Sequence, residues 1–155
     1  MRYFLDTEFN GFGGALISLA LVPEYGDQEY YVVVPLEEQP HPWVAQHVLP
    51  YLGTVPPGLS SDPVPPAQAA RDLAFYLHRD AEPLIVADWP DDIAYFCRLL
   101  VTGPGQMVAT GHLRFLFLDN TGFSTAENSR VPHNALHDAR ALRDFVLEQK
   151  GLGWV

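Results

Sequence analysis

The stretch that decides the fold lies at the start of the chain and reads Arg2-Tyr3-Phe4-Leu5-Asp6-Thr7-Glu8-Phe9. Aromatic and aliphatic side chains dominate its first part, which predicts a buried strand over 2–7. Side chains of a strand point alternately to its two faces, so Asp6 and Glu8 project from the same face. Two carboxylates at the end of a buried strand repel each other and lose hydration, so they require a cation or a proton. The alternative is a strand end whose acids are simply solvated.

The rest of the chain continues as short apolar segments separated by Gly, Pro and polar residues. Runs rich in Tyr, Val and Leu predict further strands, and apolar residues at helical spacing predict helices. The predicted strands are 2–7, 15–22, 29–35, 84–87 and 113–118, and the predicted helices are 66–79, 91–100 and 134–150. The order β-β-β-α-β-α-β-α predicts an α/β protein with a partly parallel sheet and helices on both faces.

Several segments are less regular. Residues 42–51 fit either a short helix or a loop, 53–66 is a Pro-, Gly- and Ser-rich loop or lid, and 120–132 is a polar loop. Glycines at 103 and 105 are expected to end the helix before them, and Gly151 to end the last helix. Cys97 lies on the apolar side of its predicted helix and is expected in the core.

The composition is that of an ordinary globular protein, with 155 residues of which 48% are hydrophobic and 18% are charged. This length predicts a single domain over 1–155. Apolar runs stay well below the roughly 18 to 20 residues of a membrane span. Acidic residues appear before a signal-peptide segment could form, and a lone cysteine cannot form an intramolecular disulfide. We therefore expect a cytoplasmic protein.

The net charge limits the ways in which the chain can bind a partner. Nineteen acidic residues against nine basic ones give a formal charge of -10, which argues against a protein that grips nucleic acid through a broad basic surface. A cluster of carboxylates can instead form a metal cage, and divalent ions reverse the sign of the charge in one cleft. The positions of the acids therefore decide the function.

Two further motifs carry acids at positions that suit a site. The segment 88–92, Asp-Trp-Pro-Asp-Asp, follows a predicted strand at the end where open α/β sheets place ligands. His133 lies just before the last predicted helix and Asp138 in its first or second turn, so both can face one cleft. Taken alone, each motif also fits helix capping by its acids.

In combination, the motifs resemble the DEDDh family of 3′-5′ exonucleases over almost the full length of the chain. The sequence Asp6-Thr7-Glu8-Phe9 is close to the first motif of that family. The sequence His133-Asn134-Ala135-Leu136-His137-Asp138-Ala139 is close to its last motif. In size and in its opening motif the chain is most similar to the small bacterial 3′-5′ exoribonucleases of that group. The resemblance implies a ribonuclease-H-like fold with a mixed five-stranded sheet and helices on both faces.

The resemblance also implies roles for single residues. The implied ligands of two Mg²⁺ or Mn²⁺ ions are four carboxylates: Asp6, Glu8, Asp92 and Asp138. Such hard cations prefer oxygen ligands. Asp92 is chosen as the middle ligand by its spacing from the position where the family commonly has an asparagine, and Asp88 is the reserve. His133 would act as the general base.

Other residues near these motifs are candidates for contacts with a nucleic acid. Phe9, Asn10 and Phe12 follow the first motif and could stack on or hydrogen-bond to a terminal nucleotide, although packing explains the phenylalanines equally well. Arg130 is a candidate phosphate contact, with a solvated loop arginine as the alternative. His137 would be turned about 100° from Asp138 on a helix, so we expect it at the surface or behind the site.

The resemblance predicts a 3′-5′ exonuclease that hydrolyses short or single-stranded RNA to nucleoside 5′-monophosphates. The alternatives are the same chemistry on DNA, as in a proofreading or repair exonuclease, or a non-catalytic nucleic-acid- or protein-binding module on this fold. A module needs no general base, which argues against the second alternative. A homodimer is compatible with the sequence, with Trp154 as its contact, but an aromatic residue in a tail also docks within one subunit.

Overall fold

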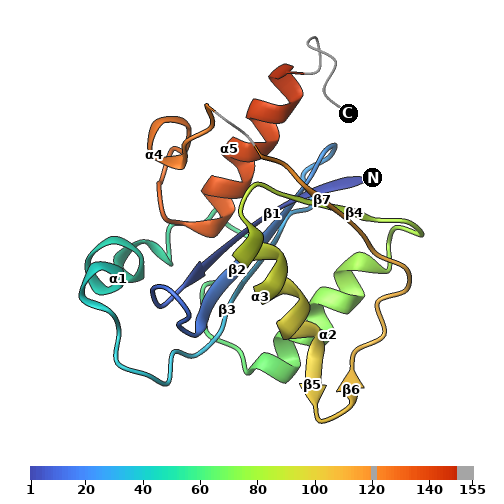
Figure 1. Ribbon diagram of the computed structural model, residues 1–155, viewed down its shortest axis with the longest axis horizontal. Helices are drawn as coiled ribbons and strands as arrows, with labels where there is room; N and C mark the ends of the chain where they lie inside the picture. The colour runs from blue at the N-terminus through green and yellow to red at the C-terminus, as the bar shows by residue number, and fades with distance from the viewer. Residues whose placement is uncertain (120–121, 150–155) are drawn as a thin grey trace.

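The protein folds around a five-stranded mixed sheet with the strand order β3-β2-β1-β4-β7. The computed structural model describes residues 1–119 and 122–149 (Figure 1). The strands of this sheet are β1 (Arg2–Phe9), β2 (Leu16–Pro23), β3 (Tyr30–Val33), β4 (Leu84–Ala87) and β7 (Arg114–Phe117). These are the strands that the sequence predicts, and the differences are confined to their ends.

The strand β1 lies at the centre of the sheet and sets the direction of its neighbours. It pairs antiparallel with β2, where Asp6 is opposite Ala20, and parallel with β4, where Phe4 is opposite Val86. β3 continues antiparallel beside β2, and β7 continues parallel beside β4. Because β1 and β4 are parallel, their carboxyl ends meet at one edge of the sheet, where open α/β sheets bind ligands.

Different helices cover the two faces of the sheet (Figure 1). The long helices are α2 (Pro66–Leu77), α3 (Pro90–Leu100) and α5 (Ala135–Glu148). α2 and α3 pack on one face and α5 packs on the other. β1 contributes side chains to the core on both faces of the sheet, because Tyr3 and Leu5 pack against α2 and α3, whereas Phe4 packs against α5. The alternation of a central strand thus carries Asp6 and Glu8 to the side that α5 covers.

Short elements complete the chain: α1 (Pro42–His47), the 3-10 helix η1 (Leu49–Tyr51), β5 (Val101–Gly103), β6 (Gln106–Met107) and α4 (Thr125–Asn128). α1 and η1 decide the open choice at 42–51 in favour of helix. The hairpin of β5 and β6 corrects the prediction that the glycines only end a helix, since Gly105 has a φ of +65° and forms the turn between two strands. α4 lies within the predicted polar loop, because four helical residues leave no periodic apolar signal.

The segment 53–66 forms a loop until α2 begins at Pro66, and this loop packs against the sheet. Val55 and Leu59 contact the apolar cluster under α5, and the Val64 backbone N donates a hydrogen bond to the Val33 carbonyl at 2.9 Å. The loop therefore lies against the sheet and does not extend away from it.

Cys97 is exposed, so the expectation of a core position is wrong. The buried side of α3 passes through Phe96 and Leu100, and a step of one residue turns a side chain about 100° around the helix. Within the described residues, no helix combines the length and the apolar character needed to cross a membrane. Gly151 and Trp154, the predicted helix stop and dimer contact, lie outside the described residues.

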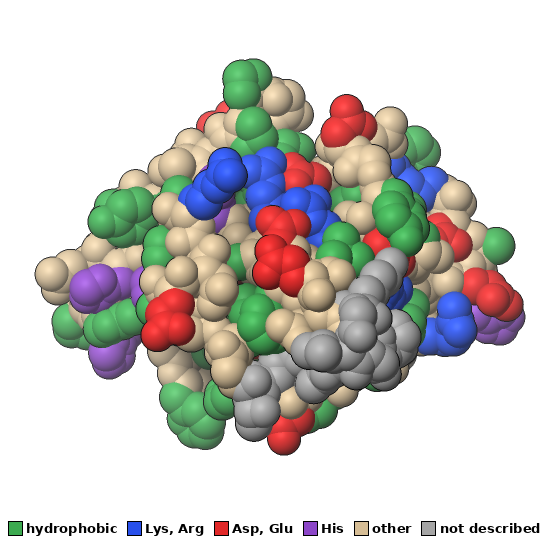
Figure 2. All heavy atoms as spheres, turned by 90° about the horizontal axis from the view of Figure 1, so that it is seen from above, with side chains coloured by type: hydrophobic (Ala, Val, Ile, Leu, Met, Phe, Trp, Pro, Cys, Tyr) green, Lys and Arg blue, Asp and Glu red, His purple; other side chains and the backbone are tan. Residues whose placement is uncertain are grey.

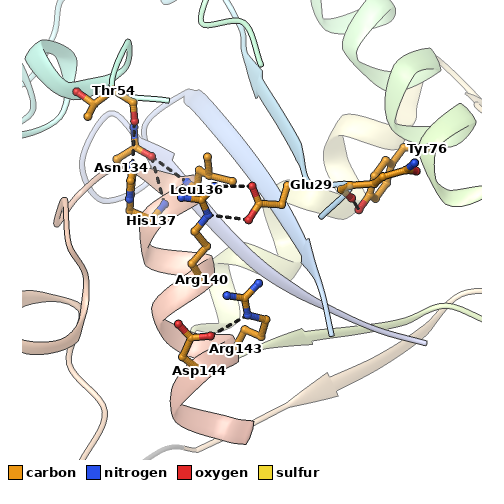
Figure 3. A network of polar contacts seen from close by, with 10 residues as sticks. Glu29, Thr54, Tyr76, Asn134, Leu136, His137, Arg140, Arg143 and Asp144 are labelled. Atoms are coloured by element: carbon orange, nitrogen blue, oxygen red, sulfur yellow. Dashed lines mark hydrogen bonds and ion pairs between the residues drawn. The ribbon is translucent and has the colours of Figure 1, made fainter. Parts of the chain in front are cut away.

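Asn134 joins the start of α5 to the chain that follows η1. Its side chain is fully buried, and its Oδ1 accepts hydrogen bonds from the backbone N of Leu136 at 3.0 Å and of His137 at 3.3 Å. Its Nδ2 donates to the Tyr51 carbonyl at 2.8 Å. Figure 3 shows that His137 reaches the same segment, where its Nε2 lies 2.9 Å from the Thr54 carbonyl. These bonds hold the beginning of α5 in place.

The first prediction concerns this anchor. Asn134→Ala removes a helix cap and leaves buried backbone groups without partners, so it should lower the free energy of unfolding by about 1 to 3 kcal/mol. The matched control is Ser124→Ala, because Ser124 is the N-cap residue of α4 but makes no capping hydrogen bond through its side chain. Urea unfolding of both variants measures the difference, and equal losses would contradict the anchoring role.

Candidate active site

A cleft of about 650 Å³ opens where β1 and β4 end and α5 begins. Its lining brings together all the residues predicted as metal ligands or base: Asp6, Glu8, Asp88, Asp92, His133 and Asp138. No residue of the loop 53–66 is among the described residues that line the cleft. The three sequence motifs therefore meet in one place although they are far apart along the chain.

Asp92 is tied to the central strand rather than to its own helix. Its side chain is only 3% exposed, and its Oδ1 accepts hydrogen bonds from the Thr7 backbone N at 3.2 Å and from the Thr7 Oγ1 at 2.5 Å. Thr7 stands between Asp6 and Glu8, so these bonds fix the middle acid beside the first motif. Helix capping does not explain the middle motif, because the N-cap of α3 is Trp89 and no side chain forms a capping bond there.

His133 and Asp138 are held together at the start of α5. The His133 backbone N donates to the Asp138 Oδ2 at 3.0 Å. His133 has a φ of +69°, and among the described residues it is the one position other than glycine with a positive φ. Such a conformation is uncommon for a non-glycine residue and often marks functional sites. One potential ligand atom each from Glu8, His133 and Asp138 lie within 4.8 Å of one another.

The histidine ring is supported by an aromatic neighbour from α1. The ring centroids of His133 and Trp43 are 4.8 Å apart with an edge-to-face orientation. Trp43 also packs on His47, with the centroids 4.8 Å apart. Burial lowers the pKa of His133 from its ordinary value, and the nearby His47 adds to this effect. The imidazole is therefore neutral at pH 7 and able to accept a proton.

The carboxylates share a weakly hydrated space, and this raises their pKa values. Burial raises the pKa of Asp6 well above its ordinary value, and the charges of Asp92, Asp138 and Glu8 add to the rise. Burial is also the main cause that raises the pKa of Glu8, that of Asp92 to about 7 and that of Asp138 to about 6. Without a cation, the cluster therefore holds protons near neutral pH.

Two oxygens of this cluster lack a hydrogen-bond partner among the described residues. They are Asp6 Oδ2 and Asp138 Oδ1, and both are buried. A buried acceptor without a partner costs free energy, so sites of this kind normally supply one. A hard divalent cation is such a partner, because Mg²⁺ and Mn²⁺ prefer carboxylate oxygens. The residues present thus fit a divalent cation.

Exposed aromatic side chains line the mouth of the cleft. Phe12 is fully exposed, and Trp43 and Trp89 are 46% and 57% exposed. Such side chains offer flat faces on which a base can stack. The sequence indicated Phe12 as a candidate contact but missed Trp43, because the position of α1 beside His133 depends on tertiary packing. The only indication in the sequence was that Trp43 is a large aromatic residue in a short segment that has few other apolar side chains to bury.

The other predicted substrate contacts are placed differently. Phe9 lines the cleft but stacks on Tyr95 with the ring centroids 4.6 Å apart, so packing explains part of its position.

The side-chain amide of Asn10 makes hydrogen bonds within the protein. Its Nδ2 donates to the Glu38 Oε1 at 2.9 Å and to the Gln39 carbonyl at 3.0 Å, and its Oδ1 accepts from the His41 backbone N at 2.7 Å. Both amide hydrogens are satisfied by the loop that leads to α1, so Asn10 positions this loop. Arg130 lies outside the cleft and lines a separate cavity beside α5.

The fold and the cleft define an α/β protein with a carboxylate-rich site that fits a divalent cation. No protein-family model matches the chain. Two proteins of Mycobacterium tuberculosis, from strains CDC 1551 / Oshkosh and ATCC 25618 / H37Rv, are each named a 3′-5′ exoribonuclease and are 36% identical to the chain over 159 residues. The alignments cover 95% of this chain and 92% of each relative. The chain belongs to the family of these 3′-5′ exoribonucleases.

The second prediction tests the cost of burying the charge of Asp92 in metal-free protein. Because the pKa of Asp92 is raised to about 7, the folded state binds a proton that the unfolded state has already released, and stability falls as pH rises toward 7. Asp92→Asn keeps the acceptor for Thr7 but removes the charge. It should raise the free energy of unfolding at about pH 8 by an amount on the order of 2 kcal/mol, and by much less at about pH 5.

Denaturant unfolding in excess chelator at both pH values measures this effect. Asp72→Asn is the matched control, since Asp72 is exposed on α2, where its Oδ1 accepts from the Gln68 Nε2 at 2.7 Å. A loss of stability in Asp92→Asn that is the same at both pH values would contradict the electrostatic account.

Proposed function

We propose that the protein is a metal-dependent 3′-5′ exoribonuclease of the DEDDh type on a ribonuclease-H-like fold. It hydrolyses short or single-stranded RNA from the 3′ end and releases nucleoside 5′-monophosphates. The observation that carries this proposal is the convergence of four carboxylates and a neutral histidine in one cleft. The kinship with proteins named 3′-5′ exoribonucleases supplies the substrate class and the polarity.

The proposed metal ligands are the acids of the cluster: Asp6, Glu8, Asp92 and Asp138. When bound, two Mg²⁺ or Mn²⁺ ions supply Lewis-acid stabilisation of the charge that develops on the phosphodiester oxygens. Asp6 and Asp138 are supported by their unpartnered buried oxygens. Asp92 is preferred to Asp88 because Thr7 fixes it beside Asp6 and because its charge is the strongest that acts on the Asp6 carboxyl.

His133 is the proposed general base, which takes a proton from the attacking water. Three observations support this role. Its ring lies at the wall of the cleft against Trp43, its backbone is bonded to Asp138, and burial keeps the imidazole neutral. A general base must be unprotonated and fixed in position, and both conditions hold for this side chain.

The mouth of the cleft suits the end of a single strand. Phe12 and Trp43 present aromatic faces next to the carboxylates, and stacking on such faces accepts any base. A duplex has no free base faces to offer except at its ends. The aromatic mouth therefore favours a frayed or single-stranded 3′ end over an intact duplex.

DNA hydrolysis by the same residues remains the second candidate for the substrate, and the comparison of matched RNA and DNA oligomers decides it. The non-catalytic module is disfavoured because it gives no reason for a neutral histidine held against a carboxylate cluster.

The third prediction is the metal dependence of RNA hydrolysis. A 5′-labelled RNA oligomer should shorten one nucleotide at a time from its 3′ end in Mg²⁺ or Mn²⁺, and excess EDTA should abolish the reaction because the clustered acids then lack a cation. Gel electrophoresis at single-nucleotide resolution measures the products, with a DNA oligomer of the same sequence alongside. Undiminished hydrolysis in chelator, or internal cleavage without a ladder, would sink the proposal.

The fourth prediction concerns the base. His133→Ala should lower kcat by about 10² to 10⁴, the usual size of a general-base contribution, while it leaves Mn²⁺ affinity within a few-fold because the carboxylates remain. His78→Ala, at the exposed end of α2, is the control and should keep full activity.

The pH profile separates the base from the acids, which also titrate. In the wild type the rate should fall as pH drops through the lowered pKa of His133, and this limb should change in His133→Ala. Near-wild-type turnover by folded His133→Ala would show that this residue is not the base.

A further inference from the structure

A second cavity, of about 530 Å³, runs along α5 outside the cleft. We call it the arginine groove, and its charged lining consists of the basic residues Arg130, His137, Arg140 and Arg143 and the acids Asp27, Glu29 and Asp144. Three of the nine Lys and Arg residues of the chain thus line one groove. Figure 2, which looks onto the end of the molecule that carries α5, shows basic side chains gathered in one group with acidic side chains beside them.

Two of the three guanidinium groups are held in place by neighbouring acids. The Arg140 Nε and Nη2 each donate to a Glu29 carboxylate oxygen at 2.6 Å, and the Arg143 Nε donates to the Asp144 Oδ1 at 2.8 Å (Figure 3). Neither pairing uses the Nη1 of Arg140 or the Nη groups of Arg143. These donors are therefore oriented by the protein and still available to an anion.

Arg130 is different, because within the described part of the chain it forms no hydrogen bond or ion pair. The His137 Nε2 faces the Thr54 carbonyl, which can only accept, so the ring proton lies on Nε2. Arg130 thus adds a guanidinium group without a described partner to the lining of the groove.

The groove lies next to the cleft. His137 and Asp138 are consecutive on α5, and a helix turns consecutive side chains about 100° apart, so the helix presents one to the groove and the other to the cleft. Arg130 and His133 are three residues apart, and three residues of even a fully extended chain span at most about 10 Å. The cleft and the groove are therefore lined by neighbouring residues of the same segment.

We propose that the arginine groove binds a backbone phosphate of the RNA strand upstream of the scissile bond. This inference rests on the proposed function and extends it from the terminal nucleotide to the body of the substrate. A protein with a formal charge of -10 repels RNA over most of its surface, so guanidinium N–H groups that remain free beside the cleft offer one of the few places where a backbone phosphate can be held. Binding of a phosphate in the groove makes the affinity of the protein for RNA depend on the length of the strand.

The test compares a dinucleotide, which cannot fill both places, with a longer RNA oligomer. Arg130→Gln removes a charge that has no partner carboxylate among the described residues. It should raise the KM for the longer RNA roughly fivefold more than the KM for the dinucleotide, and it should reduce the slope of log KM against log salt for the longer RNA by about 1. The control Arg71→Gln removes an exposed arginine from α2 and should change neither quantity.

A second variant should change the KM for the longer RNA in the opposite direction, and a folding defect cannot produce that change. Asp144→Asn removes the partly exposed acid that pairs with Arg143, so it should lower the KM for the longer RNA. Asp72→Asn on α2, where the carboxylate accepts from Gln68, is its control.

The outcomes separate this inference from the proposed function. If the wild-type protein hydrolyses no RNA, the proposed function fails. If it hydrolyses RNA but Arg130→Gln and Arg71→Gln have the same effect on the longer strand, the groove is not a phosphate site and the proposed function stands. The same holds if Asp144→Asn leaves the KM for the longer RNA unchanged.

Discussion

Electrostatic repulsion among Asp6, Glu8, Asp92 and Asp138 is the constraint on which the rest of this structure depends. The fold brings four acids from three distant segments into a cleft where burial withholds water from them. In the metal-free protein protons relieve this strain: burial is the main cause that raises the pKa values of the four acids, and repulsion within the cluster adds to the rise at Asp6 and Glu8. A divalent cation relieves it better, because it neutralises several charges at once and fills the place of the missing hydrogen-bond partners. Stability, proton binding and the proposed chemistry are therefore aspects of one interaction.

The surrounding fold keeps these acids from moving apart. β1 is the central strand, with neighbours on both sides, so Asp6 and Glu8 cannot shift without disturbing the sheet. Thr7 holds the middle acid from α3, and Asn134 fixes the start of α5 on the segment after η1. That segment leads back to α1, where Trp43 supports the ring of His133. Each element that lines the cleft is thus connected to another such element by a hydrogen bond or a packing contact.

Much of this could be predicted from the sequence, because the signals are local. The alternation in β1, the short apolar strands and the acids at strand ends predict the α/β sheet and the residues that meet in the cleft. Other features of the structure lack a local signal in the sequence. Asn10 follows the first motif as a substrate contact would, but its amide is taken by residues 38–41, and only the three-dimensional path of that loop reveals this. The support from Trp43 and the groove around Arg130 likewise arise from tertiary contacts between segments that carry no motif.

The most direct test of the account is to locate the cation. Crystals of the protein grown with Mn²⁺ should show anomalous difference density in the cleft, within coordination distance of Asp6, Glu8, Asp92 and Asp138, and Asp138→Asn should weaken it. Mn²⁺ is suitable because it accepts the same oxygen ligands as Mg²⁺. A cleft without anomalous density in protein that is active under the same conditions would contradict the central claim, because the acids would then be balanced by protons alone.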